Sequence, residues 1–119
     1  MNTEELREYC LRKPGVTESF PFDVDTLVFK VGGKVFLLES LDGHSFNAKC
    51  DPDLAEELRE RHPEVKPGYH MNKKHWNTVD LNGSLSRTEL AEMVDHSYQL
   101  IFSKLTQKQK EEIAAAGGN

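Results

Sequence analysis

The segment TLVFKVGGKVFLLES, from Thr26 to Ser40, sets the fold class of this 119-residue chain. The adjacent Gly32 and Gly33 at its centre fit a two-residue hairpin turn, whose central positions favour positive φ. The first half places apolar side chains at every second position, the period of a strand with one buried face: Leu27, Phe29 and Val31. The second half, KVFLLES, predicts an antiparallel partner strand.

Strand and turn signals continue on both sides of this hairpin. Asp42-Gly43 repeats the turn signal, and HSFNAKC follows with apolar residues on one face. A short strand is expected near VTESFPF, residues 16–22. The sequence therefore predicts an antiparallel meander from Thr26 to Cys50, preceded by a short strand.

Helix signals enclose this meander. TEELREYCLRK has Thr3 as an expected N-cap, with acids in the first turn. Asp51 and Pro52 fit the start of a second helix, and Pro63 ends it. The first helix has Leu6, Tyr9 and Cys10 on one face, whereas the narrow apolar stripe of Leu54 and Leu58 predicts that the second helix lies on the surface.

Two more helices are expected near the C-terminus. SRTE, at Ser86 to Glu89, is a capping box, and a last polar helix begins at Thr106 and frays into the tail, over about 107–119. The longer helix after Ser86 should lie across the sheet with four side chains buried: Leu90, Val94, Tyr98 and Ile101.

The order of elements predicts an α+β fold: a single compact domain over residues 1–119, with a mainly antiparallel sheet and helices on one face. A second hairpin, from about Lys66 to Leu81, should complete the sheet. We expect Lys73 and Lys74 in its exposed turn, His70 or His75 pointing inward, and Trp76 mostly covered.

Composition limits the classes of function. The formal net charge of −5 favours solubility and is not that of a broadly basic nucleic-acid-binding protein. Cys10 and Cys50 have no CxxC spacing and no secretory signal precedes them, so we expect reduced core thiols in a cytoplasmic protein. The apolar runs are too short to span a membrane, so no membrane partner is expected.

The sequence contains no recognisable metal-binding, catalytic or phosphate-binding motif. His70 and His75 are five residues apart, but no HExxH, cysteine pair or complete calcium loop occurs, so neither a metal nor another cofactor is expected. No GxSxG surrounds a serine. Glu39, Asp42 and His44 fit a polar turn better than an acid–base pair. We therefore expect no enzyme.

One segment contrasts with the acidic remainder. Between Glu64 and Asp80 there are three lysines and no carboxylate, a local charge of +3 against −8 for the rest of the chain. Lysines contact phosphates, Asn side chains donate to phosphates or base edges, and aromatic rings stack on bases. A turn between two short strands forms a wing that can lie along a duplex groove. The alternative is structural, with Trp76 and Tyr69 covering the sheet.

The run PGYHMNKKHWNTV, from Pro67 to Val79, closely resembles the signature of the MmcQ/YjbR family of small bacterial proteins. KPGVTESFPF, VFKVGGKVFLL and MVDHSYQLIFSKL extend this resemblance from about Leu6 to Leu105. The resemblance implies a CyaY-like (frataxin-like) α+β fold and a "double wing" DNA-binding role. It covers eight consecutive residues of the signature: Tyr69, His70, Met71, Asn72, Lys73, Lys74, His75 and Trp76.

We therefore expect a non-enzymatic DNA-binding module that uses the basic, aromatic segment 66–79, with weak, salt-sensitive affinity. An adaptor for a protein or a small anion, using the same patch, is the alternative, and an unrecognised enzyme ranks last. The candidate DNA- or ligand-binding residues are Lys66, Tyr69, His70, Asn72, Lys73, Lys74, His75, Trp76 and Asn77.

Overall fold

Two adjacent glycines shape the central hairpin in the computed structural model of the chain. Gly32 has φ +58° and Gly33 has φ +77°, so both adopt the left-handed backbone that a tight hairpin turn requires. The flanking strands, β2 (Thr26–Val31) and β3 (Lys34–Ser40), pair antiparallel. The expected hairpin is confirmed.

The structure describes residues 1–68 and 71–117. Within these ranges six strands form one antiparallel sheet in the order β1-β2-β3-β4-β6-β5. The remaining elements, in chain order, are α1 (Thr3–Leu11), β1 (Val16–Ser19), β4 (Ser45–Lys49), α2 (Pro52–Arg61), β5 (Val65–Pro67), β6 (Trp76–Asp80), α3 (Arg87–Phe102) and α4 (Gln107–Gly117).

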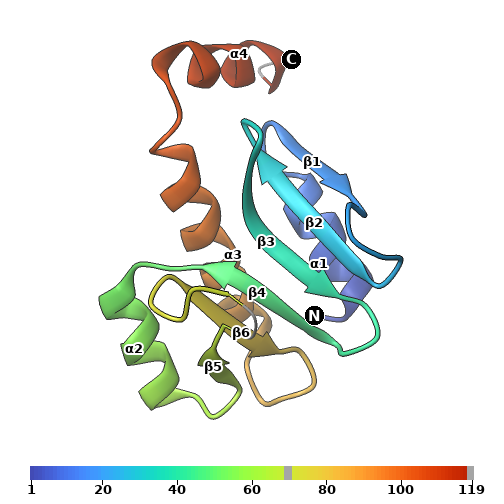
Figure 1. Ribbon diagram of the computed structural model, residues 1–119, viewed down its shortest axis with the longest axis vertical. Coiled ribbons are helices and arrows are strands. Elements are labelled where there is room, and N and C mark those ends of the chain that lie inside the picture. The colour runs from blue at the N-terminus through green and yellow to red at the C-terminus, as the bar shows by residue number, and fades with distance from the viewer. Residues whose placement is uncertain (69–70, 118–119) are drawn as a thin grey trace.

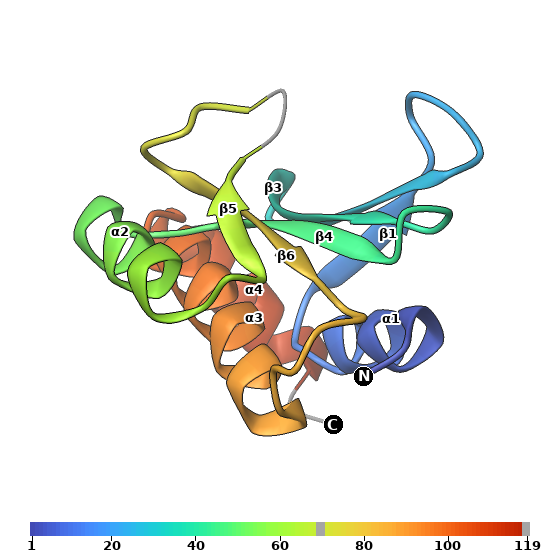
Figure 2. The same cartoon turned by 90° about the horizontal axis from the view of Figure 1, so that it is seen from below.

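The sheet has one face covered by helices and one face left open. α3 crosses the sheet behind β3 and β4, and α1 packs behind β1 and β2 (Figure 1). Figure 2 shows the helices below the sheet, while nothing helical lies above it. The predicted α+β architecture, with helices on one face of an antiparallel sheet, is confirmed.

The core lies between the sheet and α3. Tyr98 packs edge-on against Phe36, with ring centroids 5.6 Å apart, and its hydroxyl donates to the carbonyl of Pro14 at 2.6 Å. The four side chains expected to be buried on α3 have exposed fractions of 6% or less, which confirms that prediction: Leu90, Val94, Tyr98 and Ile101.

The helix caps follow the sequence signals with one correction. The capping box of Ser86 with Glu89 and the Asp51 cap are both present. The first helix, however, is capped by Asn2 rather than Thr3. The Asn2 side chain accepts the N–H of Glu5 at 2.8 Å, and Glu5 accepts the N–H of Asn2 at 3.1 Å. The reason is spacing, because a capping box needs an acid three residues after the cap.

The last helix is longer and better anchored than expected. It begins at Gln107 and continues to Gly117 instead of fraying at the alanines, which have the highest helix propensity. Gln109 Nε2 donates to the carbonyl of Gly32 at 3.2 Å, and Ile113 lies against Gly15. α4 is thereby held against the end of the sheet.

The second hairpin, expected from about Lys66 to Leu81, is confirmed. β5 (Val65–Pro67) and β6 (Trp76–Asp80) pair antiparallel and complete the sheet. Pro67 has no N–H to continue the ladder, and the last contact is the Gly68 N–H to the carbonyl of Trp76, at 2.8 Å. The connection therefore becomes a longer segment that leaves the sheet.

Cys10 and Cys50 are both buried free thiols, as expected, with exposed fractions of 0% and 3%. No helix in the described part of the chain is long and apolar enough to cross a membrane. Residues 1–68 and 71–117 contain no group of three or more His, Cys, Asp or Glu side chains placed to hold a metal ion.

Candidate ligand-binding face

The pairing of β4 with β6 identifies the side chains of the open face. Ala48 and Val79 belong to the core beneath the sheet. Because side chains alternate along a strand, Lys49, Trp76 and Thr78 point to the opposite, uncovered face. The same alternation places further side chains there from the other strands: Thr17, Ser19, Thr26, Val28, Lys30, Leu38, Ser40, Ser45, Asn47, Lys66 and Asp80.

This face is polar around a small apolar centre. Val28 and Leu38 are paired in register on β2 and β3. Beside them the Thr78 hydroxyl donates to Asn47 Oδ1 across β6 and β4. Hydroxyl and amide side chains form hydrogen bonds but carry no charge. The electrostatic potential of the face is therefore set by the charged side chains at its two ends.

Two segments rise from opposite edges of the sheet and flank this face. The sheet order places the β1–β2 loop, residues 20–25, at one edge and the β5–β6 connection at the other. Figure 2 shows both on the side away from the helices, with residues 71–75 to the left and residues 20–25 to the right. The open face therefore lies between two raised segments, and we call the uncovered sheet face between them the trough.

Lysines gather at one end of the trough. The carboxyl ends of β2, β4 and β5 point the same way, because β3 and β6 run antiparallel between them. Lys30, Lys49 and Lys66 lie on those strands, and the exposed Lys73 and Lys74 lie on the raised segment. The open face therefore carries lysines from three strands, and two more lie on the raised segment at its β5–β6 border.

A turn presents the two lysines of the raised segment. The Asn72 carbonyl accepts the N–H of His75 at 3.2 Å, and its Oδ1 accepts the N–H of Lys74 at 3.0 Å. This local bonding is typical of Asn in turns. Lys73 and Lys74 are exposed, which confirms their predicted position.

Arg59 of α2 holds this turn from behind. Its Nε donates to Asn77 Oδ1 at 2.7 Å. Its Nη2 donates to the carbonyls of Lys73 and of Trp76, the latter at 3.3 Å. Asn77 in turn donates through Nδ2 to the carbonyl of Ala55 at 3.5 Å. One guanidinium therefore fixes both ends of the lysine turn to the helix layer.

Trp76 is covered rather than presented. Its exposed fraction is 8%, as predicted, and Gly68 lies so close that an added Cβ would approach the Trp76 Cβ to 2.7 Å. Lys49 Nζ lies 5.3 Å from the ring centroid, a distance at which cation and ring attract each other. Burial lowers the pKa of Lys49, and Lys104 adds to the effect. The Trp76 ring therefore stabilises the Lys49 ammonium group by a cation–π contact.

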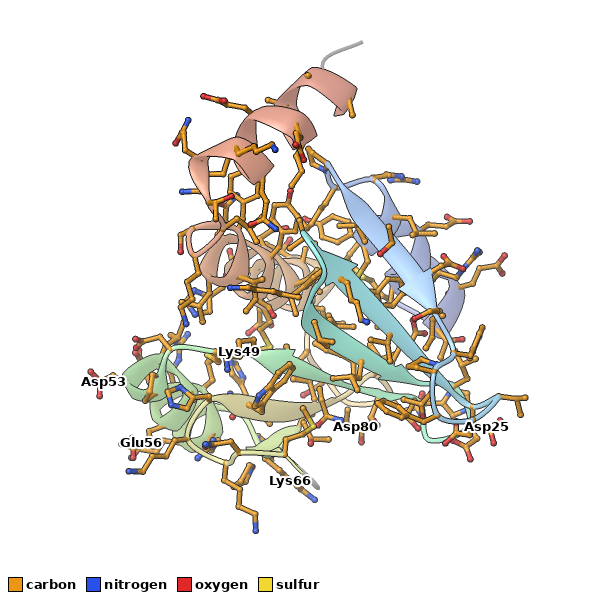
Figure 3. All side chains as sticks on the ribbon, turned by 45° about the horizontal axis from the view of Figure 1, so that its top comes forward. Asp25, Lys49, Asp53, Glu56, Lys66 and Asp80 are labelled. Carbon is orange, nitrogen blue, oxygen red and sulfur yellow. The ribbon has the colours of Figure 1, made fainter. Side chains whose placement is uncertain are left out.

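Acids occupy the other end of the trough. Asp25 precedes β2, Asp42 follows β3, and Asp80 ends β6, so all three lie beyond the same ends of the strands. Figure 3 shows Asp25 and Asp80 at one end of the sheet and Lys49 toward the other. Asp23 Oδ1 accepts the N–H groups of Asp25 and Thr26, which lowers its pKa. The face is therefore polarised from lysine to aspartate.

The predicted site residues separate into three groups. The trough or its raised edge carries Lys66, Asn72, Lys73, Lys74, His75 and Trp76, of which His75 is half-buried. Asn77 is buried and points to the helix side, where it binds Arg59. Tyr69 and His70 lie outside the described residues.

Lys30 and Lys49 were missed as site residues. Each lies between apolar residues in a predicted strand, so neither belongs to a basic segment of the sequence. Lys49 is also 27 residues from Trp76 in the sequence. The alternation of side chains along a strand could have identified them, because each lysine follows and precedes a buried residue and so must point to the opposite face. The short strand expected near residues 16–22 ends at Ser19, so Phe20 and Phe22 lie in the exposed loop rather than in a strand.

Glu39 is the one buried carboxylate among the described residues. It pairs in register with Leu27 and Phe46, so it points into the core, and neither of its oxygens has a hydrogen-bond partner. Burial raises the pKa of Glu39 to about 7, with the nearby Arg7 acting in the opposite direction. It lies beneath the sheet and takes no part in the open face.

A cavity of about 150 Å³ lies between α2, α3 and the sheet. Its walls are largely apolar, and its two histidines already have partners. His62 Nε2 lies 3.4 Å from Glu89, and His96 Nε2 accepts the N–H of Asp51 at 3.1 Å. The cavity is on the helix side of the sheet, and Lys49 of β4 contributes to its lining.

The family model for YjbR matches residues 11–100, which include β1 to β6 and most of α3. The chain belongs to the YjbR family. YjbR of Escherichia coli K12 is 37% identical over 112 residues, covering 92% of this chain and 95% of the relative. YbdF of Escherichia coli O157:H7 is 36% identical, with 92% of each chain covered.

Solved structures of similar proteins share the same fold. Deinococcus radiodurans protein DR2400, with a DUF419 domain, is 39% identical and has a TM-score of 0.88, covering 95% of this chain and 88% of that one. A protein from Pseudomonas syringae is 29% identical with a TM-score of 0.74, covering 84% and 98%. The names of these similar proteins state no activity.

Proposed function

We propose that this YjbR protein is a non-enzymatic DNA-binding module and that the lysine end of the trough holds the phosphate backbone. The observation that carries the proposal is that five lysines lie on or beside the one sheet face that no helix covers. Lys ammonium groups bind phosphates as mobile point charges. Because Arg59 fixes the lysine turn in place, Lys73 and Lys74 lose little additional freedom on binding.

The charges around the trough set the expected affinity. The aspartates at the far end repel phosphates, and α2 carries Asp53 and Glu56 beyond Lys49 (Figure 3). Phosphate contacts are therefore limited to the lysine end. Each phosphate contact contributes a slope of about −0.9 to the dependence of log K on log salt. A footprint this small binds weakly and loses affinity steeply as salt rises.

The test is a titration of a short fluorescent duplex at several salt concentrations. Lys73→Glu with Lys74→Glu should abolish binding at low salt. Replacing the same two lysines with Gln should instead reduce the salt slope by about two units. Lys34→Glu with Lys108→Glu is the matched control, because both lysines are exposed, lie away from the trough and give the same change in net charge.

Either of two results would reject the proposal: wild-type protein that does not bind duplex at low ionic strength, or a control variant that loses as much affinity as the trough variant. A single-stranded probe of the same sequence, run in parallel, reports whether the trough prefers a duplex.

A specific observation favours an adaptor for a protein as the second candidate. Phe20, Phe22 and Val24 have exposed fractions of 49%, 74% and 80%. Large apolar side chains gathered on one exposed loop are typical of a protein contact. They lie across the trough from the lysines, so the two candidates use different sides of it.

A further inference from the structure

The exposed apolar loop has a defined shape. Asp23 Oδ1 accepts the N–H of Asp25 at 2.9 Å and of Thr26 at 2.7 Å, and the N–H of Leu41 binds the carbonyl of Asp25 at 2.9 Å. These bonds tie the loop to the β3–β4 turn. We name residues 20–25 together with Asp42 the acidic edge, because this set contains three carboxylates, Asp23, Asp25 and Asp42, and no basic residue.

The opposite edge carries complementary charge. We name residues 71–75 the basic edge, because Lys73 and Lys74 are its exposed charges and it contains no acid. The two edges belong to opposite borders of the same sheet and rise on the same side (Figure 2). One molecule therefore displays both halves of an ionic contact, but too far apart to join them itself.

A twofold axis joins them between two molecules. If two copies face each other trough to trough, rotation about an axis parallel to the sheets exchanges the two borders. The basic edge of each copy then meets the acidic edge of the other, and the contact is made twice. A self-complementary surface of this kind is what a twofold-symmetric dimer requires.

We propose that the chain forms a twofold dimer through its open faces, with Lys73 and Lys74 of each copy paired to Asp25 and Asp42 of the other. Phe22 and Val24 then lose contact with water against the aliphatic stems of the lysines. A second copy is favoured over another partner because both complementary charges are present on this one face.

The net charge of each copy determines the salt concentration at which the dimer should form. Two chains of charge −5 repel each other over long distances. At an ionic strength of about 0.15 M, charges separated by more than about 8 Å are largely screened, whereas direct contacts persist. The dimer should therefore be present at this salt concentration and dissociate at about 1 M, where the screening distance falls to about 3 Å.

Sedimentation velocity over a concentration series tests the proposal. Wild-type protein should shift from the 13.6 kDa monomer toward twice that mass. Asp25→Lys with Asp42→Lys should weaken the dimer at least tenfold. Asp23 is kept because its carboxylate builds the loop. Phe22→Ser, at an exposed position that the fold does not need, should weaken it independently of charge.

Mixing two variants with reversed charges gives the most specific test of the pairing. Lys73→Glu with Lys74→Glu should also give a monomer, and mixing it with the Asp25→Lys, Asp42→Lys variant should restore a dimer. Glu111→Lys with Glu112→Lys makes the same charge change on α4 and should dimerise like wild type.

Three results would overturn the dimer. Wild-type protein could stay monomeric at all salt concentrations, or the Glu111→Lys, Glu112→Lys control could dimerise as weakly as the Asp25→Lys, Asp42→Lys variant. The third is a mixture of the two charge-reversed variants that stays monomeric. The inference does not rest on DNA binding. A dimer without DNA affinity, or DNA affinity without a dimer, separates the two proposals. If both hold, duplex DNA should dissociate the dimer, since both use Lys73 and Lys74.

Discussion

Arg59 on α2 and Asn77 on β6 are joined by a hydrogen bond of 2.7 Å between Nε and Oδ1. Asn77 is buried with an exposed fraction of 2%, so no water replaces this donor. The pair connects the helix layer to the strand that follows the lysine turn, and it makes the stability of the fold and the shape of the basic edge depend on the same guanidinium.

Arg59→Ala should therefore lower the free energy of unfolding by about 1–3 kcal/mol, the usual penalty for leaving a buried polar group without its partner. Urea denaturation measures it. Arg61→Ala, two residues along the same helix, removes an exposed ion pair with Glu57 and should cost less than about 1 kcal/mol. Equal losses in the two variants would contradict the role given to Arg59.

Glu39 should make stability fall as pH rises. Its folded pKa of about 7 lies above the ordinary value of 4.5, so between these pH values the folded state binds more protons than the unfolded state. Stability from this group is complete below pH 4.5 and is lost as pH rises through 7. The loss is on the order of 3 kcal/mol, at about 1.36 kcal/mol per pKa unit.

Urea midpoints measured across this pH range should show the trend. Glu39→Leu removes both the titration and the two unpartnered oxygens, so it should flatten the profile and raise stability above the wild-type value near neutral pH. Glu56→Gln, on the exposed face of α2, is the control. A profile that keeps its slope in Glu39→Leu would show that another group is responsible.

The two thiols should react slowly in the native protein. Burial raises the pKa of Cys50 to about 11 and that of Cys10 further above its ordinary value, and only the thiolate attacks a disulfide reagent. Ellman's reagent should therefore label native protein far more slowly than protein in denaturing urea. Rapid labelling of either thiol under native conditions would show that its side chain is accessible.

The two hairpin glycines should differ in their tolerance of alanine. A Cβ on Gly32 would lie 2.6 Å from Leu105, whereas one on Gly33 meets nothing within 4 Å. Each substitution carries the left-handed backbone cost of about 1–2 kcal/mol, but only Gly32→Ala must also displace Leu105. Urea denaturation should show the greater loss for Gly32→Ala, and equal losses would remove the packing argument.

Local patterns in the sequence predicted much of the fold. The strand period around Gly32 placed the central hairpin, and the Ser86–Glu89 spacing placed the start of α3, because both signals act within a few residues. The cap of α1 was assigned one residue late, since Thr3 is a good cap type but only Asn2 has an acid three positions on.

The site was predicted less completely, because its charges come from distant parts of the chain. Lys73 and Lys74 share a segment and were found together. Lys30 and Lys49 join them only through the pairing of β2, β3, β4 and β6. Asn77 was grouped with the ligand-binding residues because sequence proximity does not reveal that it faces Arg59.

The strand order also has a consequence for how the chain folds. β1 to β4 each pair with the next strand in the sequence through short loops, whereas α2 and β5 lie in the chain between β4 and its neighbour β6. Contacts between distant residues form more slowly because closing longer loops costs more entropy. We therefore expect the N-terminal meander to form early in folding, and the lysine turn to form late, with the longer-range pairing of β6 to β4.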